Sequence, residues 1–377
     1  MLRRTQPRPR LLPGTPRAAS GCACSWGLFV MLGSAASVMA RDAQTTELAR
    51  AWTAHVATDA TAFGVSRDGS LLAVGTGSGM VFVFDVESGQ LRFQALAHSG
   101  GVLSLDWSAR QLLATAGQDG HARLFDTRGR QLAELPGMAA WVEQVVWSPN
   151  GEKLATASGK VVGIWTASGT LAWRTDAHES FITGLAWNQR STELVTVCDG
   201  GAQLFRVAPQ SRTRRFPCRG SLISLAWSPS GAVIACGTQD CSVRFWRLSS
   251  GQDSEISGFP SKPRALAWDA EGRLLATGGD STVNVWTFDG AGPEGTPSIQ
   301  LVGHQALCTA LAFHPTQAVL ASGADDMQVL LWKPRMERTP LLVGRLEDTI
   351  TAIAWALAGK RLLAADASGT VRCWRFE

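Results

Sequence analysis

The chain has 377 residues, in which 35 lysines and arginines face 31 acidic residues, and its net charge is +4. Much of this excess comes from residues 1–41, which contain arginines and no acidic residue. The rest of the chain is close to neutral, which argues against general binding of nucleic acid. The 15 tryptophans occur without a single tyrosine, so the placement of the aromatic residues is the pattern to explain.

From Thr46 to Glu377 the chain repeats one pattern eight times. Each copy closes with a large aromatic residue, and successive closing residues lie 41, 40, 40, 41, 40, 46 and 42 positions apart. The closing residues are Phe84, Phe125, Trp165, Phe205, Trp246, Trp286, Trp332 and Trp374. A period of this length marks stacked structural units, none of which can bury its apolar face alone.

Each unit contains three short strand patterns. The first pattern ends in a bulky residue, and these residues are Val65, Trp107, Trp147, Trp187, Trp227, Trp268, Phe313 and Trp355. A turn such as Ser228-Pro229-Ser230-Gly231 follows, in which proline presets the turn and glycine takes the left-handed position. An apolar run and an alternating run complete the unit. Short strands at even spacing predict an all-β closed or radial array. Helices are not predicted, because no segment shows a sustained period of 3.6 residues.

The seventh unit carries polar residues at spaced positions that resemble those of the WD-repeat, or transducin-type, β-propeller family. In that family a His, a Ser or Thr, an Asp and a Trp form a buried hydrogen-bonded tetrad. The resemblance places His304, Ser322, Asp326 and Trp332 in such a tetrad. The second unit keeps three of the four residues, which are His98, Thr115 and Asp119, while Phe125 replaces the tryptophan. A relay of this kind would satisfy several buried polar groups at once.

The number of blades follows from counting strand patterns. Eight first strands and eight third strands predict eight four-stranded blades, although seven blades, the family's commonest number, plus a stray unit is the rival. The sequence ends three residues after Trp374, which leaves the eighth blade without an outer strand of its own. We expect Thr46–His55 to supply that strand and so join the N- and C-terminal strands in one sheet. Such closure removes exposed sheet edges.

Residues 1–45 read as a leader that precedes a single propeller domain at 46–377. The apolar run Trp26–Ala40 ends in small residues suited to signal-peptidase cleavage, and the arginine-rich start also suits an organelle transit peptide. A third reading is that Met39 is the true start. The run is too short to span a bilayer, which needs about 20 residues. Six cysteines in the repeats favour the cytoplasm, where thiols stay reduced, over export to the periplasm or an organelle.

Motifs for catalysis, metal binding and cofactor binding are absent from the sequence. It has no Gly-x-Ser-x-Gly elbow, no phosphate-binding glycine loop and no His-Glu-x-x-His motif. The histidines and cysteines also lack zinc-ligand spacing. The prediction is therefore a non-enzymatic protein without metal or cofactor. The alternative is an exported propeller with ligand-binding or hydrolytic activity at its central channel.

A partner would meet the loops that lead into the first strands. The third position after the repeat histidine is not required by the core, so bulky residues there are informative. That position holds Trp141, Phe181, Lys262 and Leu307, with Glu143 and Arg264 nearer the channel rim. The resemblance adds the residues before the tetrad aspartate position, which are Gln118, Gln239 and Asp325. The prediction is a scaffold for an unidentified protein or peptide, monomeric outside its complexes.

Overall fold

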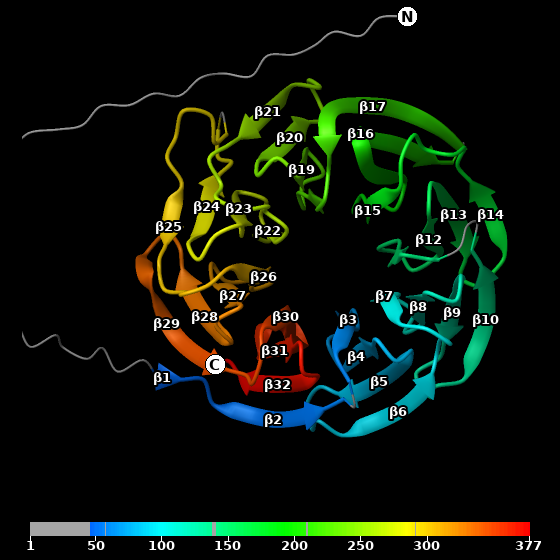
Figure 1. Cartoon of the computed structure of the whole chain (residues 1–377), viewed down its shortest axis with the longest axis horizontal. Coiled ribbons are helices and arrows are strands. Elements are labelled where there is room, and N and C mark those ends of the chain that lie inside the picture. The colour runs from blue at the N-terminus through cyan, green and yellow to red at the C-terminus, as the bar shows by residue number, and fades with distance from the viewer. Residues whose placement is uncertain (1–45, 57, 138–140, 209, 291) are drawn as a thin grey trace, which may run out of the picture. The chain divides into compact units, whose positions relative to one another are not determined.

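The strands of the chain form eight sheets arranged around a central channel (Figure 1). The structure, a computed structural model, describes residues 46–377 apart from 57, 138–140, 209 and 291. The expected leader, residues 1–45, lies outside the described residues. Within the described part there is no α-helix, and a single 3-10 turn, η1, covers Leu357–Gly359. No helix there is long and apolar enough to cross a membrane.

The first four blades follow each other in chain order, and each runs from the channel outward. Blade 1 comprises β3 (Ala60–Val65), β4 (Leu71–Thr76), β5 (Met80–Asp85) and β6 (Leu91–Leu96). Blade 2 comprises β7 (Val102–Trp107), β8 (Leu113–Gly117), β9 (His121–Phe125) and β10 (Gln131–Pro136). Blade 3 comprises β11 (Gln144–Trp147), β12 (Lys153–Ser158), β13 (Val161–Thr166) and β14 (Leu171–Arg174). Blade 4 comprises β15 (Ile182–Trp187), β16 (Glu193–Val207) and β17 (Gln210–Ser221).

The last four blades complete the ring. Blade 5 comprises β18 (Ala226–Trp227), β19 (Val233–Gly237), β20 (Val243–Arg247) and β21 (Asp253–Ile256). Blade 6 comprises β22 (Leu266–Trp268), β23 (Leu274–Thr277), β24 (Val283–Thr287) and β25 (Ile299–Leu301). Blade 7 comprises β26 (Cys308–Phe313), β27 (Leu320–Ala324), β28 (Gln328–Lys333) and β29 (Glu337–Arg345), and β1 (Thr46–Glu47) pairs in parallel with β29. Blade 8 comprises β30 (Ile350–Ala356), β31 (Arg361–Asp366), β32 (Thr370–Arg375) and β2 (Arg50–His55).

Blade 4 differs from the others because its second and third strands merge into one element. The chain turns back within β16 at Gly200 and Gly201, whose φ angles are 89° and 128°. Thr196 and Gln203 consequently face each other, with Oγ1 of the former 3.5 Å from the carbonyl oxygen of the latter. Positive φ is accessible to glycine at little cost, so a tight turn forms here without interrupting the strand.

The turns between the first and second strands have the geometry that their sequences predict. Gly151, Gly231 and Gly272 all have positive φ, between 69° and 74°. The serine that opens the turn also fixes it, since Ser228 Oγ accepts the backbone N–H of Val233 at 3.0 Å. These contacts hold the ends of the inner strands at one side of the ring, away from the loops that lead into them.

Core residues lie between neighbouring blades. Every residue of β8 and of β27 is buried, and both strands are rich in alanine and glycine, which lets adjacent sheets approach closely. Leu124, Leu135, Val145, Trp147 and Leu154 illustrate the arrangement, since they form one cluster shared by blades 2 and 3. Burial of this apolar surface is the main favourable term that holds one blade against the next.

The bulky residues at the ends of the inner strands also link the blades by hydrogen bonds. Trp107 Nε1 donates to Gly64 O at 3.2 Å, and Trp355 Nε1 donates to Ala312 O at 3.0 Å. In each case the acceptor lies on the inner strand of the preceding blade. The repeat therefore favours tryptophan at this position for its N–H group as well as for its size.

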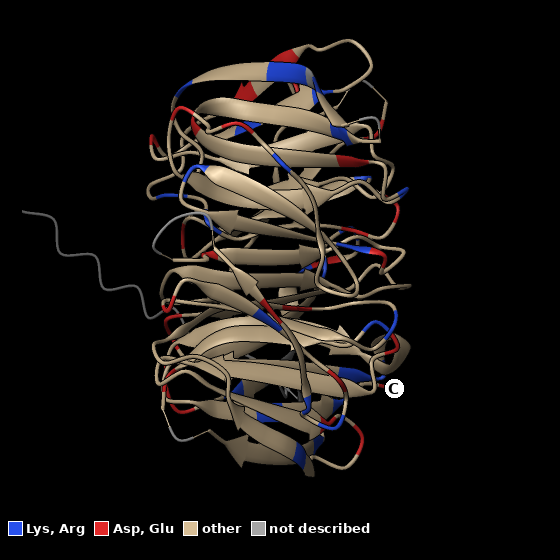
Figure 2. Cartoon of the chain, turned by 90° about the vertical axis from the view of Figure 1, so that its right-hand side faces the viewer, with Lys and Arg blue, Asp and Glu red and all other residues tan. Residues whose placement is uncertain are grey.

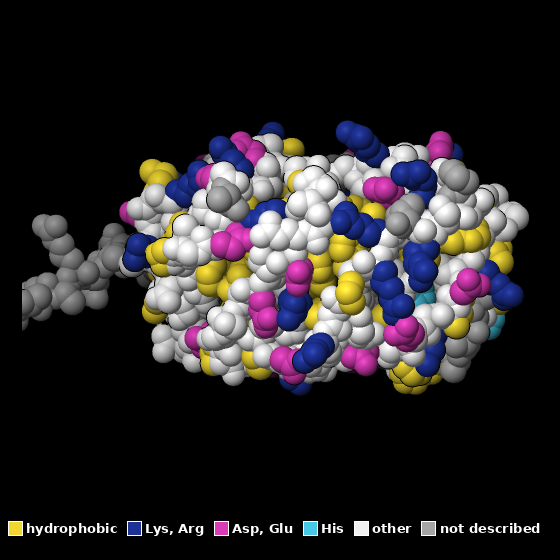
Figure 3. Space-filling model, turned by 90° about the horizontal axis from the view of Figure 1, so that it is seen from above, with side chains coloured by type: hydrophobic (Ala, Val, Ile, Leu, Met, Phe, Trp, Pro, Cys, Tyr) yellow, Lys and Arg dark blue, Asp and Glu magenta, His cyan; other side chains and the backbone are white. Residues whose placement is uncertain are grey.

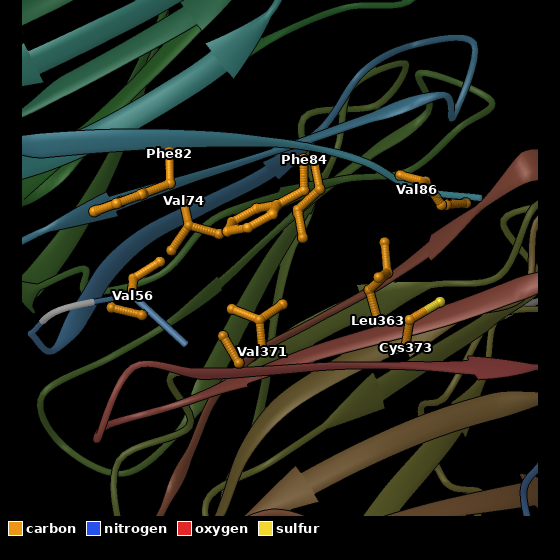
Figure 4. Packing of buried hydrophobic residues seen from close by; sticks show 12 residues of the cluster. Val56, Val74, Phe82, Phe84, Val86, Leu363, Val371 and Cys373 are labelled. Atoms are coloured by element: carbon orange, nitrogen blue, oxygen red, sulfur yellow. The ribbon is translucent and has the colours of Figure 1, made fainter. Parts of the chain in front are cut away.

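The ring closes by pairing of the two terminal regions, and the prediction of eight blades is confirmed. β2 pairs antiparallel with β32, and Thr53 lies opposite Arg372. The joint between blades 8 and 1 is filled by an apolar cluster that includes Phe82, Phe84, Leu363 and Val371 (Figure 4). The rival of seven blades is excluded, because the eighth sheet is complete once β2 joins it.

Candidate partner-binding face

Beneath the loops at one end of the blades, blade 7 contains the full hydrogen-bonded tetrad. His304 Nδ1 lies 3.0 Å from Asp326 Oδ2, and its Nε2 lies 2.8 Å from Ser322 Oγ. Trp332 Nε1 donates to the same Ser322 Oγ at 2.8 Å. Because a carboxylate only accepts, we assign the imidazole proton to Nδ1, so that Ser322 donates to Nε2 and accepts from the indole.

Burial sets the protonation of this tetrad. Desolvation lowers the pKa of His304 below its ordinary value of 6.5, against the opposing influence of Asp326. The imidazole is thus held neutral, which the relay of single donors and acceptors requires. These groups are committed to one another beneath the surface, and their chemistry is structural.

Blade 2 contains a modified version of the same network. His98 Nδ1 lies 2.9 Å from Asp119 Oδ1, and its Nε2 lies 2.9 Å from Thr115 Oγ1. Arg123 adds an ion pair with Asp119 at 2.6 Å. Burial raises the pKa of Asp119, but the hydrogen bonds from His98 and Arg123 outweigh it and lower this pKa to about 2. Arginine on the third strand anchors the aspartate in a blade where Phe125 contributes no N–H.

Partial tetrads persist in blades where the sequence pattern is degraded. His178 Nε2 lies 2.9 Å from Thr196 Oγ1. These two residues are 18 positions apart in the sequence, as are His304 and Ser322. Trp165 Nε1 donates to Thr156 Oγ1 at 2.9 Å in blade 3. A spacing of 17 or 18 residues between the histidine and the hydroxyl residue is the signal by which the sequence would have revealed His178 and Thr196.

Above the tetrads lies the surface that we call the loop face, formed by the segments that lead into the inner strands. Trp141 precedes β11, Phe181 precedes β15 and Leu307 precedes β26, all at the same position of the repeat. Their exposed fractions are 49%, 63% and 37%. Apolar side chains of this size are costly to leave in water, so three at equivalent positions form a recurring feature of the face.

The two residues predicted nearer the channel rim have different surroundings. Glu143 is half-buried, and its Oε2 accepts the backbone N–H of Gly159 at 2.9 Å, which ties the carboxylate to the blade 3 turn. Arg264 is exposed and, among the described residues, has neither a hydrogen bond nor an ion pair. The Glu143 side chain is thus fixed by a backbone hydrogen bond, whereas that of Arg264 is not.

The three residues before the tetrad aspartate position all lie exposed in turns between second and third strands. Gln118 Oε1 accepts the backbone N–H of Gly101 at 3.0 Å. The backbone N–H of Gln239 donates to Ser221 O, and that of Asp325 donates to Leu307 O, both at 2.9 Å. These bonds attach each turn to the loop that leads into the inner strand of the same blade, so the loop face is internally braced.

A pocket of about 490 Å³ brings three of the predicted residues together on this face. Lys262, Arg264 and Leu307 all line it, from the loops that lead into blades 6 and 7. Trp141 and Phe181 belong to blades 3 and 4 and do not line it. The predicted residues therefore fall into an aromatic pair at one part of the ring and a cationic pocket at another.

Charges elsewhere on the outer surface are mixed. Basic and acidic groups are interspersed on the two sides of the molecule that Figures 2 and 3 show. Many of them are paired, including Arg244 with Asp253 at 3.1 Å and Arg247 with Glu294 at 2.6 Å. Among the described residues, no group of three or more His, Cys, Asp or Glu side chains could hold a metal ion.

The eight blades, the hydrogen-bonded tetrads and the tryptophans that donate to the neighbouring blade define the protein as a β-propeller made of repeats. Residues 129–166, 211–247, 254–287, 295–333 and 339–375 match the family described as "WD domain, G-beta repeat". Residues 42–110 match the "Anaphase-promoting complex subunit 4 WD40 domain". The chain belongs to the WD-repeat family.

Its similarity to individual proteins is modest. It is 24% identical over 276 residues to the WD repeat-containing protein slp1 of Schizosaccharomyces pombe. The alignment covers 71% of this chain and 48% of that protein. It is 24% identical over 278 residues to the Anaphase-promoting complex subunit cdh1 of Dictyostelium discoideum, covering 71% and 35%. The transcriptional corepressor LEUNIG_HOMOLOG of Arabidopsis thaliana is 25% identical over 272 residues, covering 59% and 34%. The chain thus spans about half the length of these relatives, or less.

Among solved structures, the chain resembles the computationally designed Ika8 protein. The TM-score is 0.75 at 22% identity, and the match covers 88% of this chain and all of that one. At this identity the likeness supports the fold alone.

Proposed function

We propose that this propeller is a non-enzymatic platform that binds another protein or peptide on its loop face. The observation that carries the proposal is the recurrence of exposed Trp141, Phe181 and Leu307 at one repeat position. Aromatic side chains are the usual energetic centres of protein interfaces. A closed ring of braced loops also loses little conformational entropy on binding, which favours recognition of a partner by a preformed surface.

The names of similar proteins support a role in binding other proteins. One is called a subunit of the anaphase-promoting complex and another a transcriptional corepressor, and both names describe proteins that act together with other proteins. The interspersed charges in Figures 2 and 3 also favour a protein partner over nucleic acid, which would need a continuous basic surface.

Affinity capture from a cell extract tests the proposal. The full chain and the double variant Trp141→Ala/Phe181→Ala are immobilised at equal density, and the captured proteins are quantified by mass spectrometry. The control is Leu96→Ala/Leu171→Ala, which removes exposed apolar side chains from the outer strands of blades 1 and 3. We expect the loop-face variant to lose its partners and the control to keep them. Equal capture by all three proteins would show that these aromatic residues do not bind the partner.

A further inference from the structure

The boundary between the inner strands of blades 6 and 7 lacks a side-chain hydrogen bond that three other boundaries have. At those three a threonine on one inner strand donates to a backbone carbonyl of the next blade. Thr61 Oγ1 donates to Val102 O, Thr183 Oγ1 to Leu222 O and Thr309 Oγ1 to Ile350 O, each at 2.6 Å. Blade 6 has Arg264 at the equivalent position, four residues before the end of its inner strand. In the described part of the chain, no such side-chain bond crosses from Arg264 to blade 7.

The indole hydrogen bond between neighbouring inner strands is also missing at this boundary. Trp268 Nε1 donates back to Ala226 O at 3.2 Å, from blade 6 to blade 5. Blade 7 ends its inner strand with Phe313, which has no N–H to donate to blade 6. The two blades share an apolar cluster, which includes Leu274, Cys308 and Leu320, and the backbone N–H of Cys308 donates to Asp280 O at 2.9 Å. Their inner strands therefore lack both the threonine link and the indole link.

This boundary is where the pocket of about 490 Å³ opens. Its size lies in the range of ligand-binding pockets, which is about 300 to 1,000 Å³. Pro260, Leu307 and Cys308 give it an apolar lining, and Cys241 reaches it from the turn of blade 5. A single apolar side chain, with part of its backbone, is an occupant of suitable size and polarity.

Charge at the pocket has one sign. Lys262 and Arg264 are exposed and line it, and no Asp or Glu does. Among the described residues, neither cation lies within 4.0 Å of a carboxylate, whereas Arg244 and Arg247 are both paired. Asp325 marks the rim, where its backbone N–H donates to Leu307 O. Two unpaired cations beside an apolar surface are complementary to carboxylates that flank an apolar residue.

We propose that this pocket binds an acidic peptide segment of a protein partner. One apolar side chain of the peptide packs against Leu307 and Pro260, and neighbouring Asp or Glu carboxylates pair with Lys262 and Arg264. The proposal rests on the proposed function, because it names the chemistry of a partner that the loop face would recognise. It gives the blade 6–7 pocket a role separate from that of the aromatic pair, Trp141 and Phe181.

Peptide titration with the full chain tests this assignment. The probes are a fluorescent library of heptapeptides with a central Leu, Ile, Met, Phe or Trp between Asp and Glu residues. Matched libraries carry Lys and Arg in place of the acids, or a central Ser. We expect the acidic apolar library to bind, and binding to weaken as salt rises from about 50 to 500 mM, because exposed charges are screened.

Variants then locate the binding site. Lys262→Glu/Arg264→Glu should weaken binding of the acidic peptides at least about tenfold, since two attractive contacts become repulsive. Leu307→Ser should weaken binding while leaving its salt dependence unchanged. The milder Lys262→Gln/Arg264→Gln, checked by circular dichroism, guards against misfolding. Arg190→Glu, an exposed charge change in the turn of blade 4 outside the pocket, should leave binding unchanged.

Three results would overturn the pocket assignment: no binding by the acidic library, preference for the basic library, or full-strength binding by the Lys262→Glu/Arg264→Glu variant. The extract capture with Trp141→Ala/Phe181→Ala keeps the two proposals apart. If that variant loses its partners while the peptides fail to respond to the pocket variants, the platform stands and the pocket assignment falls.

Discussion

The indole Nε1 of Trp187 donates a hydrogen bond to Val146 O, on the neighbouring blade, at 2.9 Å. Its counterpart in blade 3, Trp147 Nε1, has no partner among the described residues, although it is buried. The backbone N–H of Trp147 donates instead to Asp106 Oδ2 at 2.6 Å. Two tryptophans at one repeat position thus differ in whether the indole N–H has a partner.

This difference gives a matched pair of substitutions. Trp187→Phe and Trp147→Phe remove similar volume from similar sites, but only the first breaks an indole hydrogen bond. We expect Trp187→Phe to lower the free energy of unfolding by about 1 kcal/mol more than Trp147→Phe, which removes an unsatisfied donor. Urea unfolding, followed by circular dichroism, measures both. Equal losses would show that the indole bonds add nothing beyond packing.

The tetrad of blade 7 supplies a second prediction. Ser322→Ala leaves His304 Nε2 and Trp332 Nε1 buried without their shared partner. Each orphaned buried group costs about 1 to 3 kcal/mol, so we expect a loss of roughly 2 to 4 kcal/mol in the free energy of unfolding. Ser322→Cys is the control, since Cys236 occupies the same repeat position in blade 5 and a thiol retains weak hydrogen bonding. A Cys variant as unstable as the Ala variant would contradict the hydrogen-bond explanation.

Much of the fold could be predicted because its determinants recur along the chain. The period located the strands, and the missing outer strand of the eighth unit pointed to Thr46–His55. Of this segment Arg50–His55 forms β2 in blade 8, whereas Thr46–Glu47 pairs with β29 of blade 7. The tetrad positions, such as His304 and Ser322, followed from the resemblance to the WD-repeat family, and the structure confirms their hydrogen bond. Repetition turns weak local signals into a reliable assignment, because eight copies must satisfy one architecture.

Features that depend on contacts between separate segments of the chain were not accessible in this way. Glu143 was predicted for partner binding by its position, yet one of its oxygens accepts the N–H of Gly159. The pocket at Arg264 is lined by residues from blades 5, 6 and 7, which no local pattern reports. The fused strand β16 likewise depends on how closely Gly200 and Gly201 allow the chain to turn.

Acid should destabilise the ring through its buried histidines. Burial lowers the pKa of His98, His178 and His304 below the ordinary value of 6.5. Above a pH of about 6.5 these histidines are neutral in both the folded and the unfolded protein, and their contribution to stability is fully present. As pH falls through the folded pKa values the unfolded state binds more protons, so stability falls, by at most about 1.4 kcal/mol per pH unit per histidine.

Unfolding free energies at pH 7.5 and 5.5 test this dependence. The wild-type protein should be less stable at pH 5.5, and His304→Gln should show a smaller fall because one proton-binding group is gone. Trp332→Phe damages the same tetrad but keeps the histidine, so its fall should equal that of the wild type. A larger fall in His304→Gln than in the wild type would reverse the assigned sign.

Closure of the ring can be tested at Gly369, beside the joint between the terminal strands. Its φ angle is 89°, and its carbonyl accepts the N–H of Val56 at 2.9 Å. A Cβ at this position would collide with the backbone oxygens of Thr58 and Val56. Gly231 is the matched control, since its φ is 74° but a Cβ there meets nothing within 4 Å.

Both glycine substitutions force alanine into the left-handed region, which costs roughly 1 to 2 kcal/mol. Only Gly369→Ala adds a clash that pushes the segment after β2 away from blade 8. We expect Gly369→Ala to lose at least about 1 kcal/mol more than Gly231→Ala in urea unfolding, because strain at an over-determined site adds to the conformational cost. Hydrogen exchange should rise selectively along β2 and β32, whose pairing depends on this junction. If exchange rises equally in all eight blades, the pairing of β2 with β32 does not open independently, and the ring instead unfolds as one cooperative unit.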